Sequence, residues 1–449
     1  MQRIMKKWIF LFCTGWLNAF TLPAADSWDL RQCIGYALEH NRDLKIQQWN
    51  VESQQTRLVE AYTAFLPSLS AQSGVNFSFG RSVDPETNTY GTVSNLNNSY
   101  STSLSVPLFT GGNLIHQFKL TRLQLAQGKS QTEARRDNMV LNLMELYIQA
   151  SYYQELASYT ESKLDESRIQ VKKVHRLKEL GLKSKTDVAL IEAQYAADDY
   201  NHAHTLHLLD NALLALKKEM AYPVTEELHI ASADWHVTVP LVPSEPFQDE
   251  IAHTYRVAEA RLPEMRQSRL AVDASLYGKR QALSRFFPDI SFSAGMSSSY
   301  FRTLGKADFI PYARQLRNNW GQYLSFNISF PLFNRLGNAM NYKRSKIAYR
   351  SAQEEYAQRQ DELWADVQQA ILDRESLRKE YLHMEQKVKA DSIAYAVIAR
   401  KFDEGMAAPL DLRTASNTLL SSRATLLQCK LNHLLKCRLV SYYQGEPLY

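Results

Sequence analysis

Three histidines are the first side chains that suggest chemistry. His202, His204 and His207 follow one another closely in the chain, and histidine is the commonest metal ligand in proteins. If the segment is helical, however, His202 and His204 point to different faces, and only His204 and His207 have a spacing that brings two side chains together. The cluster is therefore more typical of a solvated helix face than of a metal site.

Cysteine chemistry is equally limited. After residue 25 the chain has only Cys33, Cys429 and Cys437, and no CxxC pair that would indicate a metal or redox motif. Cys429 and Cys437 would lie about 12 Å apart along one helix, which is too far for a disulfide between them. The sequence also has no phosphate-binding glycine loop, no HExxH and no GxSxG motif. We therefore expect no catalytic residue, metal or cofactor, and predict that the protein is not an enzyme.

The N-terminal segment is typical of a secretory signal peptide. Residues 1–25 combine early basic residues with a mostly apolar run and with the small residues Ala24 and Ala25. The alternative is an uncleaved anchor helix, for which the apolar run is short. Phe12 precedes Cys13, where a lipoprotein signal needs a small residue. Removing the segment lowers the net charge from +5 to +2, so no nucleic-acid partner is expected.

Glycine and proline, which interrupt helices, are scarce. The 449 residues include only 16 glycines and 14 prolines, about 7% against roughly 12% in average proteins. Residues 182–222, 338–404 and 410–444 contain neither, and residues 113–180 contain only Gly128. Apolar residues in three-and-four spacing predict that these segments are long helices packed as coiled coils. A helix over 338–404 would be about 100 Å long.

Four segments alternate apolar and polar residues and are predicted as strands. Their polar positions are almost all serine, asparagine or glycine. This pattern suits a transmembrane barrel that faces lipid outside and water inside, and the alternative is a soluble antiparallel sheet packed on one face. Polar loops at 81–97 and 301–319 join the strands in pairs. The predicted strands cover residues 68–80, 98–109, 288–300 and 320–332.

The chain is internally duplicated. Gly181 and Asp187 are followed 224 residues later by Gly405 and Asp411, and the strand patterns repeat at nearly the same offset. The long helices are expected at 113–180, 182–222, 334–404 and 410–444. The predicted organisation is a signal peptide at 1–25, a first repeat at 26–222, a connector with four prolines at 223–246, a second repeat at 247–444 and a short tail at 445–449.

Four strands per chain cannot close a barrel by themselves. The smallest transmembrane barrels have eight strands, and an open sheet edge cannot lie in lipid. Closure therefore requires several chains, and three would supply twelve strands. The predicted fold class is mostly α, with a long coiled-coil α-helical barrel and four strands per chain that form a trimeric twelve-stranded membrane barrel.

Two glycine-containing turns carry a family resemblance. Gly181–Val188 reads GLKSKTDV and Phe402–Leu412 reads FDEGMAAPLDL. Both resemble the helix turns of TolC-like outer membrane efflux proteins. Ala37–Asn41 is similar to the family's opening helix, although Arg42 replaces its proline. The resemblance covers nearly the whole chain after the signal peptide.

The resemblance implies a passive duct without catalysis. It implies a homotrimer with its barrel in the lipid of the cell outer membrane and its helical tube in the periplasm. The duct would be the exit channel of a tripartite efflux or type I secretion system. It would open when a periplasmic adaptor and an inner-membrane pump of the resistance-nodulation-division or ABC type dock, and its cargo is not specified. The residues alone leave a second possibility, a periplasmic coiled-coil scaffold without a pore.

The resemblance also implies a gate at the tip. Asp411 matches a carboxylate that lines the family's closed constriction, and three copies would form an acidic ring that favours cations. Thr414 replaces the family's second aspartate and halves the expected charge. The alternative role for Asp411 is a helix N-cap after Pro409.

Further roles follow from the same resemblance. The arginine that joins the two turns in some members matches Ala407, so Asp187 is expected to use Lys183 or Lys185 of a neighbouring hairpin. The first helix begins, and the last one ends, near the waist of the tube, which predicts a disulfide of Cys33 with one of the two C-terminal cysteines, Cys429 or Cys437. The turn residues expected to contact the adaptor are Gly181, Leu182, Thr186, Phe402, Gly405 and Leu410.

Overall fold

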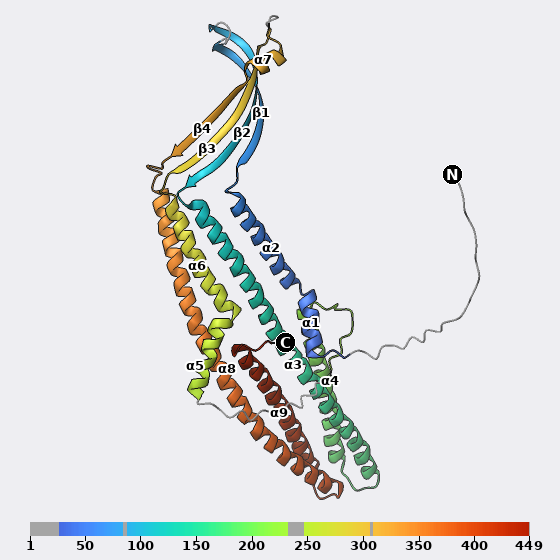
Figure 1. Ribbon diagram of the computed structural model, residues 1–449. Helices are drawn as coiled ribbons and strands as arrows, with labels where there is room; N and C mark the ends of the chain where they lie inside the picture. The colour runs from blue at the N-terminus through green and yellow to red at the C-terminus, as the bar shows by residue number, and fades with distance from the viewer. Residues whose placement is uncertain (1–26, 84–87, 232–246, 306–308, 449) are drawn as a thin grey trace, which may run out of the picture.

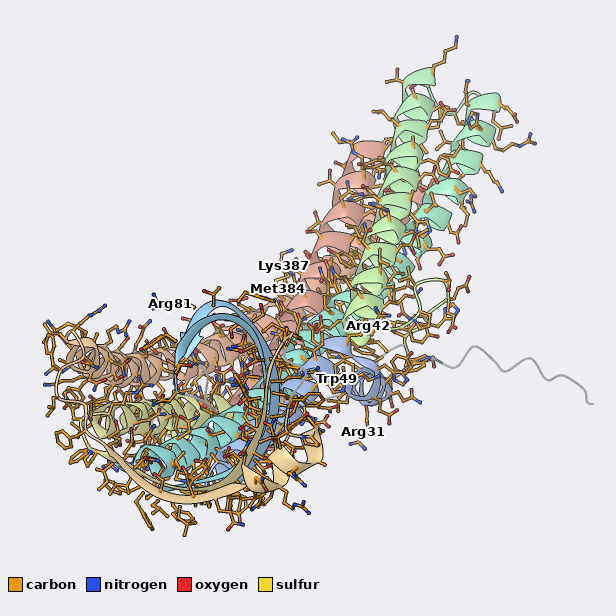
Figure 2. All side chains as sticks on the ribbon, turned by 90° about the horizontal axis from the view of Figure 1, so that it is seen from above. Arg31, Arg42, Trp49, Arg81, Met384 and Lys387 are labelled. Atoms are coloured by element: carbon orange, nitrogen blue, oxygen red, sulfur yellow. The ribbon has the colours of Figure 1, made fainter. Side chains whose placement is uncertain are left out.

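The computed structural model describes residues 27–83, 88–231, 247–305 and 309–448. The molecule is elongated, with one sheet at one end and long helices that run from it to the other end (Figure 1). Seen along its length, the sheet forms a curved arc (Figure 2). This architecture confirms the predicted fold class for the single chain. The predicted signal peptide and most of the predicted connector lie outside the described residues.

The element order repeats, with two helices, two strands and two long helices in each half. The first half contains α1 (Leu30–His40), α2 (Arg42–Thr63), β1 (Ser68–Val83), β2 (Tyr90–Thr110), α3 (Asn113–Glu179) and α4 (Lys185–Met220). The second half contains α5 (Phe247–Arg261), α6 (Pro263–Ser284), β3 (Asp289–Thr303), α7 (Tyr312–Asn318), β4 (Gly321–Ser329), α8 (Gly337–Asp403) and α9 (Pro409–Tyr443).

The four strands form one antiparallel sheet in the order β1-β2-β3-β4. Leu69 lies opposite Leu104, Leu104 opposite Ala294, and Ala294 opposite Leu324, so one face of the sheet is apolar. These side chains do not form a core, since the Leu324 side chain is 77% exposed. None of the helices within the described ranges has an apolar stretch that could cross a lipid bilayer.

The strand ends differ from the prediction at the loops. The first loop was expected over 81–97, but β1 continues to Val83 and β2 begins at Tyr90, because the hairpin ladder continues beyond the apolar residues. The second loop contains α7, which has too few residues to show a helical period in the sequence. β4 ends at Ser329, before Pro331, which lacks the N–H that a ladder needs.

Each half also has a broken first helix. Asn41 separates α1 from α2, and its Oδ1 accepts hydrogen bonds from the backbone N–H of Asp43 (2.9 Å) and Leu44 (3.2 Å). In the second half Pro263 occupies the first position of α6, where its missing N–H costs nothing. Each half therefore has two helices before its first strand.

The apolar cores lie between helices, and the cysteines are part of them. Cys33 is fully buried among residues of α1, α3 and α4, and Cys429 and Cys437 lie on α9. All three are free thiols, so the predicted disulfide of Cys33 with either of the others is wrong. Burial raises the pKa of Cys33 to about 12, which keeps the thiol protonated and unreactive.

Candidate functional site: the tip of the helical hairpins

The tip of the molecule is formed by two equivalent turns, α3 to α4 and α8 to α9 (Figure 1). Gly181 and Gly405 adopt left-handed φ values of +73° and +78°, which glycine tolerates best. In each turn two backbone N–H groups bond back to the helix that ends there, as in a Schellman motif. The four bonds are Gly181 to Lys178 (2.9 Å), Leu182 to Leu177 (2.9 Å), Gly405 to Phe402 (3.1 Å) and Met406 to Lys401 (2.8 Å).

The next helix begins with a carboxylate in both turns, and Asp187 and Asp411 each occupy its third position. The Asp187 carboxylate accepts the Ser184 N–H at 3.1 Å, and the Ser184 hydroxyl accepts the Asp187 N–H at 3.1 Å, which is a complete capping box. These bonds from Ser184 lower the pKa of the Asp187 carboxyl. Asp411 accepts the N–H of Ala408 at 3.2 Å, but Ala408 has no hydroxyl to return the bond.

The two residues predicted for the constriction lie together on the first turns of α9. Both Asp411 and Thr414 are exposed, and the Thr414 hydroxyl donates to the carbonyl of Leu410 at 2.9 Å. The suggested N-cap role of Asp411 needs correction, since the N-cap is Ala408 and Asp411 supports it from the third helical position. The carboxylate itself remains open to solvent.

The predicted docking residues separate into exposed and buried ones. Leu182 and Leu410 are exposed, as is Thr186, and a side chain added at Gly181 or Gly405 would meet no atom within 4 Å. Phe402 is different, because it is only 4% exposed. It forms an apolar cluster with residues of the other three tip helices, namely Val174 of α3, Val188 and Ile191 of α4 and Leu412 of α9. Phe402 holds the hairpins together and is not available for docking.

Polar contacts across the two hairpins were not predicted from the sequence. Lys173 of α3 pairs with Asp403 of α8 at 2.5 Å, and the Tyr395 hydroxyl of α8 donates to Glu166 of α3. Within the single chain, the Lys183 Nζ lies 5.4 Å from the centre of the Phe402 ring, and the predicted pairing of Asp187 with Lys183 or Lys185 of a neighbouring hairpin stays a prediction. Helical spacing shows which face a residue occupies but not which helix lies opposite, so the sequence carries no direct signal for these pairs.

A buried polar cluster lies behind these contacts. The Lys163 ammonium is 3.2 Å from Asp198, whose side chain is 2% exposed, and it also donates to Asn417 of α9. Gln194 donates to Asp198 Oδ1 at 2.8 Å, whereas Asp198 Oδ2 has no hydrogen-bond partner among the described residues. The cluster borders a cavity of about 50 Å³. Burial raises the pKa of the neighbouring Glu166.

The three histidines lie on α4, and each contacts a different residue. His202 Nδ1 is 3.2 Å from the Thr160 hydroxyl, the His204 ring stacks on Tyr200, and His207 Nε2 is 3.1 Å from Asn211 Nδ2. Within the described part of the chain, no group of three or more ligating side chains is close enough to hold a metal ion.

Comparison with known proteins shows that this chain, including the tip and the sheet, matches a known family. The family model for outer membrane efflux proteins matches residues 33–221 and 254–435. The probable outer membrane lipoprotein SilC of Salmonella typhimurium is 22% identical over 442 residues, covering 92% of this chain and 84% of SilC.

Solved structures of low sequence identity share the fold. The outer membrane protein VceC of Vibrio cholerae has a TM-score of 0.76 at 15% identity, covering 94% of this chain and 97% of VceC. The CmeC outer membrane channel of Campylobacter jejuni has a TM-score of 0.78 at 14% identity, covering 93% of this chain and 87% of CmeC.

These findings decide between the two functions that the sequence left open. The family match extends over both repeats, as the duplication predicted, and favours the outer membrane exit channel over a periplasmic scaffold. The sheet therefore lies in the outer membrane and the long helices extend into the periplasm. The chain belongs to the outer membrane efflux protein family.

Proposed function

We propose that three copies of the chain form a passive exit duct. The observation that carries this proposal is the pair of open edges, because β1 and β4 are the outer strands of the sheet. In lipid, each backbone group left unpaired at such an edge costs several kcal/mol. Pairing β4 with β1 of a neighbouring copy removes both edges, and three copies supply twelve strands. Passage through such a duct needs no catalytic residue, so the protein is not an enzyme in this proposal.

The helical part supports the same assembly. α8 exposes Ile347, Ile393 and Val397 in the single chain, and the Ile393 side chain is 68% exposed. Ile393 and Val397 lie one turn apart, and apolar side chains grouped on an exposed helix face are typical of a surface that a partner covers. A neighbouring copy would cover them and close the long helices into a tube.

The proposed gate is the tip, where the contacts Glu166–Tyr395 and Lys173–Asp403 hold the two hairpins together. Opening the tube requires the hairpins to separate and therefore these contacts to break. Three exposed Asp411 carboxylates would ring the closed end. An acidic ring attracts cations, so it would slow cation exit at the constriction while the tip is closed.

The other gate residues have supporting roles in this proposal. Thr414, one turn farther along α9 than Asp411, would line the same constriction with an uncharged hydroxyl. Asp187 stabilises the start of α4 through its capping box with Ser184, and an ion pair with Lys183 or Lys185 of a neighbouring hairpin would add to it.

The partners are a periplasmic adaptor and an inner-membrane pump of the resistance-nodulation-division or ABC type. The exposed Leu182, Met406 and Leu410 give the tip an apolar rim that an adaptor would cover. Gly181 and Gly405 leave the backbone accessible there, since a side chain added at either would meet no atom within 4 Å.

Single-channel recording in planar bilayers tests the proposal. Asp411→Asn keeps an oxygen that can accept the Ala408 N–H but removes the charge, so we expect weaker block by divalent cations added on the tip side. The matched control is Asp187→Asn, which makes the same change in the other turn and should leave the block unchanged. Equal block in wild type and Asp411→Asn would contradict the acidic ring, and a monomer mass from light scattering of the purified protein would contradict the trimer.

A further inference from the structure

The loop between β3 and β4 builds a surface that the duct itself does not require. α7 packs against the sheet through Tyr312, Gln315, Leu316 and Asn319, whose spacing places them on one side of the helix. Each of them bonds to β2 or β3, so α7 is held rigidly. The bonds are Tyr312 to Tyr100 (2.6 Å between hydroxyls), Gln315 to the backbone N–H and C=O of Phe301 (2.9 and 2.8 Å), Ser298 to the Leu316 carbonyl (2.7 Å) and Asn319 to the Ser299 carbonyl (2.8 Å).

The helix covers the lipid-facing side of the sheet. Tyr100 and Ser298, which α7 contacts, are direct partners across β2 and β3. They lie on the same face as Leu104 and Ala294, because side chains two residues apart share a face. That face is the apolar one, whereas the serine-rich face remains uncovered by α7.

The height of α7 matches the outer surface of the membrane. Ile290, paired with Ile328, lies near the helical end of β3, and Tyr300 lies ten residues farther along the strand, against the Tyr312 ring. Ten residues at about 3.4 Å with a tilt of about 40° give a rise of about 26 Å. The apolar band of outer membrane barrels is about 25 Å tall. α7 therefore lies level with the lipid headgroups of the outer leaflet.

At this height α7 presents positive charge. Arg314 and Arg317, one turn apart, are both exposed on the side that faces away from the sheet. The Arg302 guanidinium lies 4.2 Å from the centre of the Phe309 ring, and Trp320 is exposed beside the helix. The segment 309–320 contains no aspartate or glutamate. Exposed aromatic side chains next to basic ones are typical of a membrane interface.

We propose that α7 is a docking site for a phosphorylated lipid of the outer leaflet, with Arg314 and Arg317 binding its phosphate groups. The planar guanidinium matches phosphate oxygens in a two-bond geometry. α7 lies over the two central strands, so pairing of β1 and β4 with neighbouring copies leaves it uncovered. A protein partner would need about 800 Å² on its side of the interface, far more than one seven-residue helix provides.

Native mass spectrometry of the purified, assembled channel titrated with bisphosphorylated lipid A tests this inference. Each basic residue near an anionic lipid surface contributes about fivefold to affinity, so Arg314→Gln with Arg317→Gln should weaken binding about 30-fold. The matched control, Lys172→Gln with Arg176→Gln, removes two neighbouring charges from α3 and should bind as wild type does. Lysine at positions 314 and 317 should retain most of the affinity.

Three outcomes would overturn the inference. They are unchanged affinity of the glutamine variant, equal binding of dephosphorylated lipid A, and displacement of lipid A by millimolar inorganic phosphate, which would indicate a free-phosphate site. The side chains are exposed, so the variant should show the wild-type circular dichroism spectrum. The inference rests on the sheet lying in the outer membrane and not on the gate, and Asp411→Asn should leave lipid binding unchanged.

Discussion

The two repeats have long helices of equal length in unequal surroundings. α3 begins at Asn113 and α8 at Gly337, a shift of 224 residues, and both contain 67 residues. Yet 18 residues of α3 are buried and only five of α8. α3 is enclosed by α2, α4, α6 and α9, whereas much of α8 faces outward. Duplication kept the length of the helix, but only the first copy is enclosed by helices of the same chain.

A second difference concerns one lysine in each repeat. In the first repeat Lys163 pairs with Asp198 of α4 at 3.2 Å, and both side chains are largely buried. Ser167, one turn farther along α3, is also buried. A carboxylate on the opposite helix therefore neutralises the lysine.

In the second repeat the same three positions are occupied differently. Lys387 corresponds to Lys163 and pairs at 2.6 Å with Asp391, at the position of Ser167. Ser422 of α9, at the position of Asp198, accepts from Lys387 at 2.5 Å. Aspartate and serine have exchanged places, so the site needs one carboxylate but not on a particular helix. Lys387 is half exposed, and Figure 2 shows it at the side of α8.

The largest predicted effect follows from the burial of the ion pair between Lys163 and Asp198 in the first repeat. Asp198→Ser leaves the buried Lys163 ammonium without its counter-charge, which typically costs about 3–5 kcal/mol in the free energy of unfolding. Asp391→Ser makes the same change beside a half-exposed lysine, and we expect a clearly smaller loss because solvent screens an exposed ion pair. Thermal unfolding followed by circular dichroism at neutral pH measures both.

The exchange itself provides the control for this prediction. Ser167→Asp combined with Asp198→Ser gives the first repeat the arrangement of the second, and should recover most of the stability lost in Asp198→Ser. A double variant no more stable than the single one would show that the carboxylate must come from α4.

A smaller effect is expected at the two tip turns. Ser184→Ala removes the hydroxyl half of the capping box with Asp187 and should destabilise the first hairpin by about 1 kcal/mol. Ala408→Ser adds the missing half beside Asp411 and should stabilise the second hairpin by a similar amount. Chemical denaturation in detergent measures the free energy of unfolding of both variants relative to wild type. Destabilisation by Ala408→Ser would mean that the turns are not equivalent.

The sequence was most informative where a single residue determines the local backbone. Gly181 and Gly405 predicted the turns because a left-handed residue must follow each long helix, and alternation predicted the four strands and the shared apolar face. The part of β1 beyond Gly80 and the start of β2 before residue 98 were missed, because polar residues can extend a ladder past the lipid without changing its pattern.

Contacts between distant segments were not predictable from one sequence. Tyr395 of α8 and Glu166 of α3 meet only because the two hairpins approach each other near the tip, and nothing in the spacing of either helix specifies that neighbour. Phe402 was assigned to the surface from its place in a turn motif, although it lies in the core between four helices. Position in a motif does not by itself reveal burial.

The smallest predicted effect is a difference between the two repeats in how their folding stability depends on pH. Burial raises the pKa of Glu166 above its ordinary value of 4.5, so the folded state favours the protonated form, and this contribution to stability declines as pH rises from 4.5 through the folded pKa. The hydrogen bond from Lys387 lowers the pKa of Asp391 below 3.8, so its contribution is present above 3.8 and is lost as pH falls through the folded pKa.

Two isosteric variants should therefore flatten opposite ends of the profile of melting temperature against pH. Glu166→Gln, which can still accept the Tyr395 hydroxyl, should remove part of the decline above pH 4.5. Asp391→Asn should remove part of the decline below pH 3.8. If Glu166→Gln instead reduced the loss of stability on acidification, Glu166 would be stabilised as a carboxylate, and the Tyr395 hydroxyl of α8 would donate its hydrogen bond to a charged group of α3.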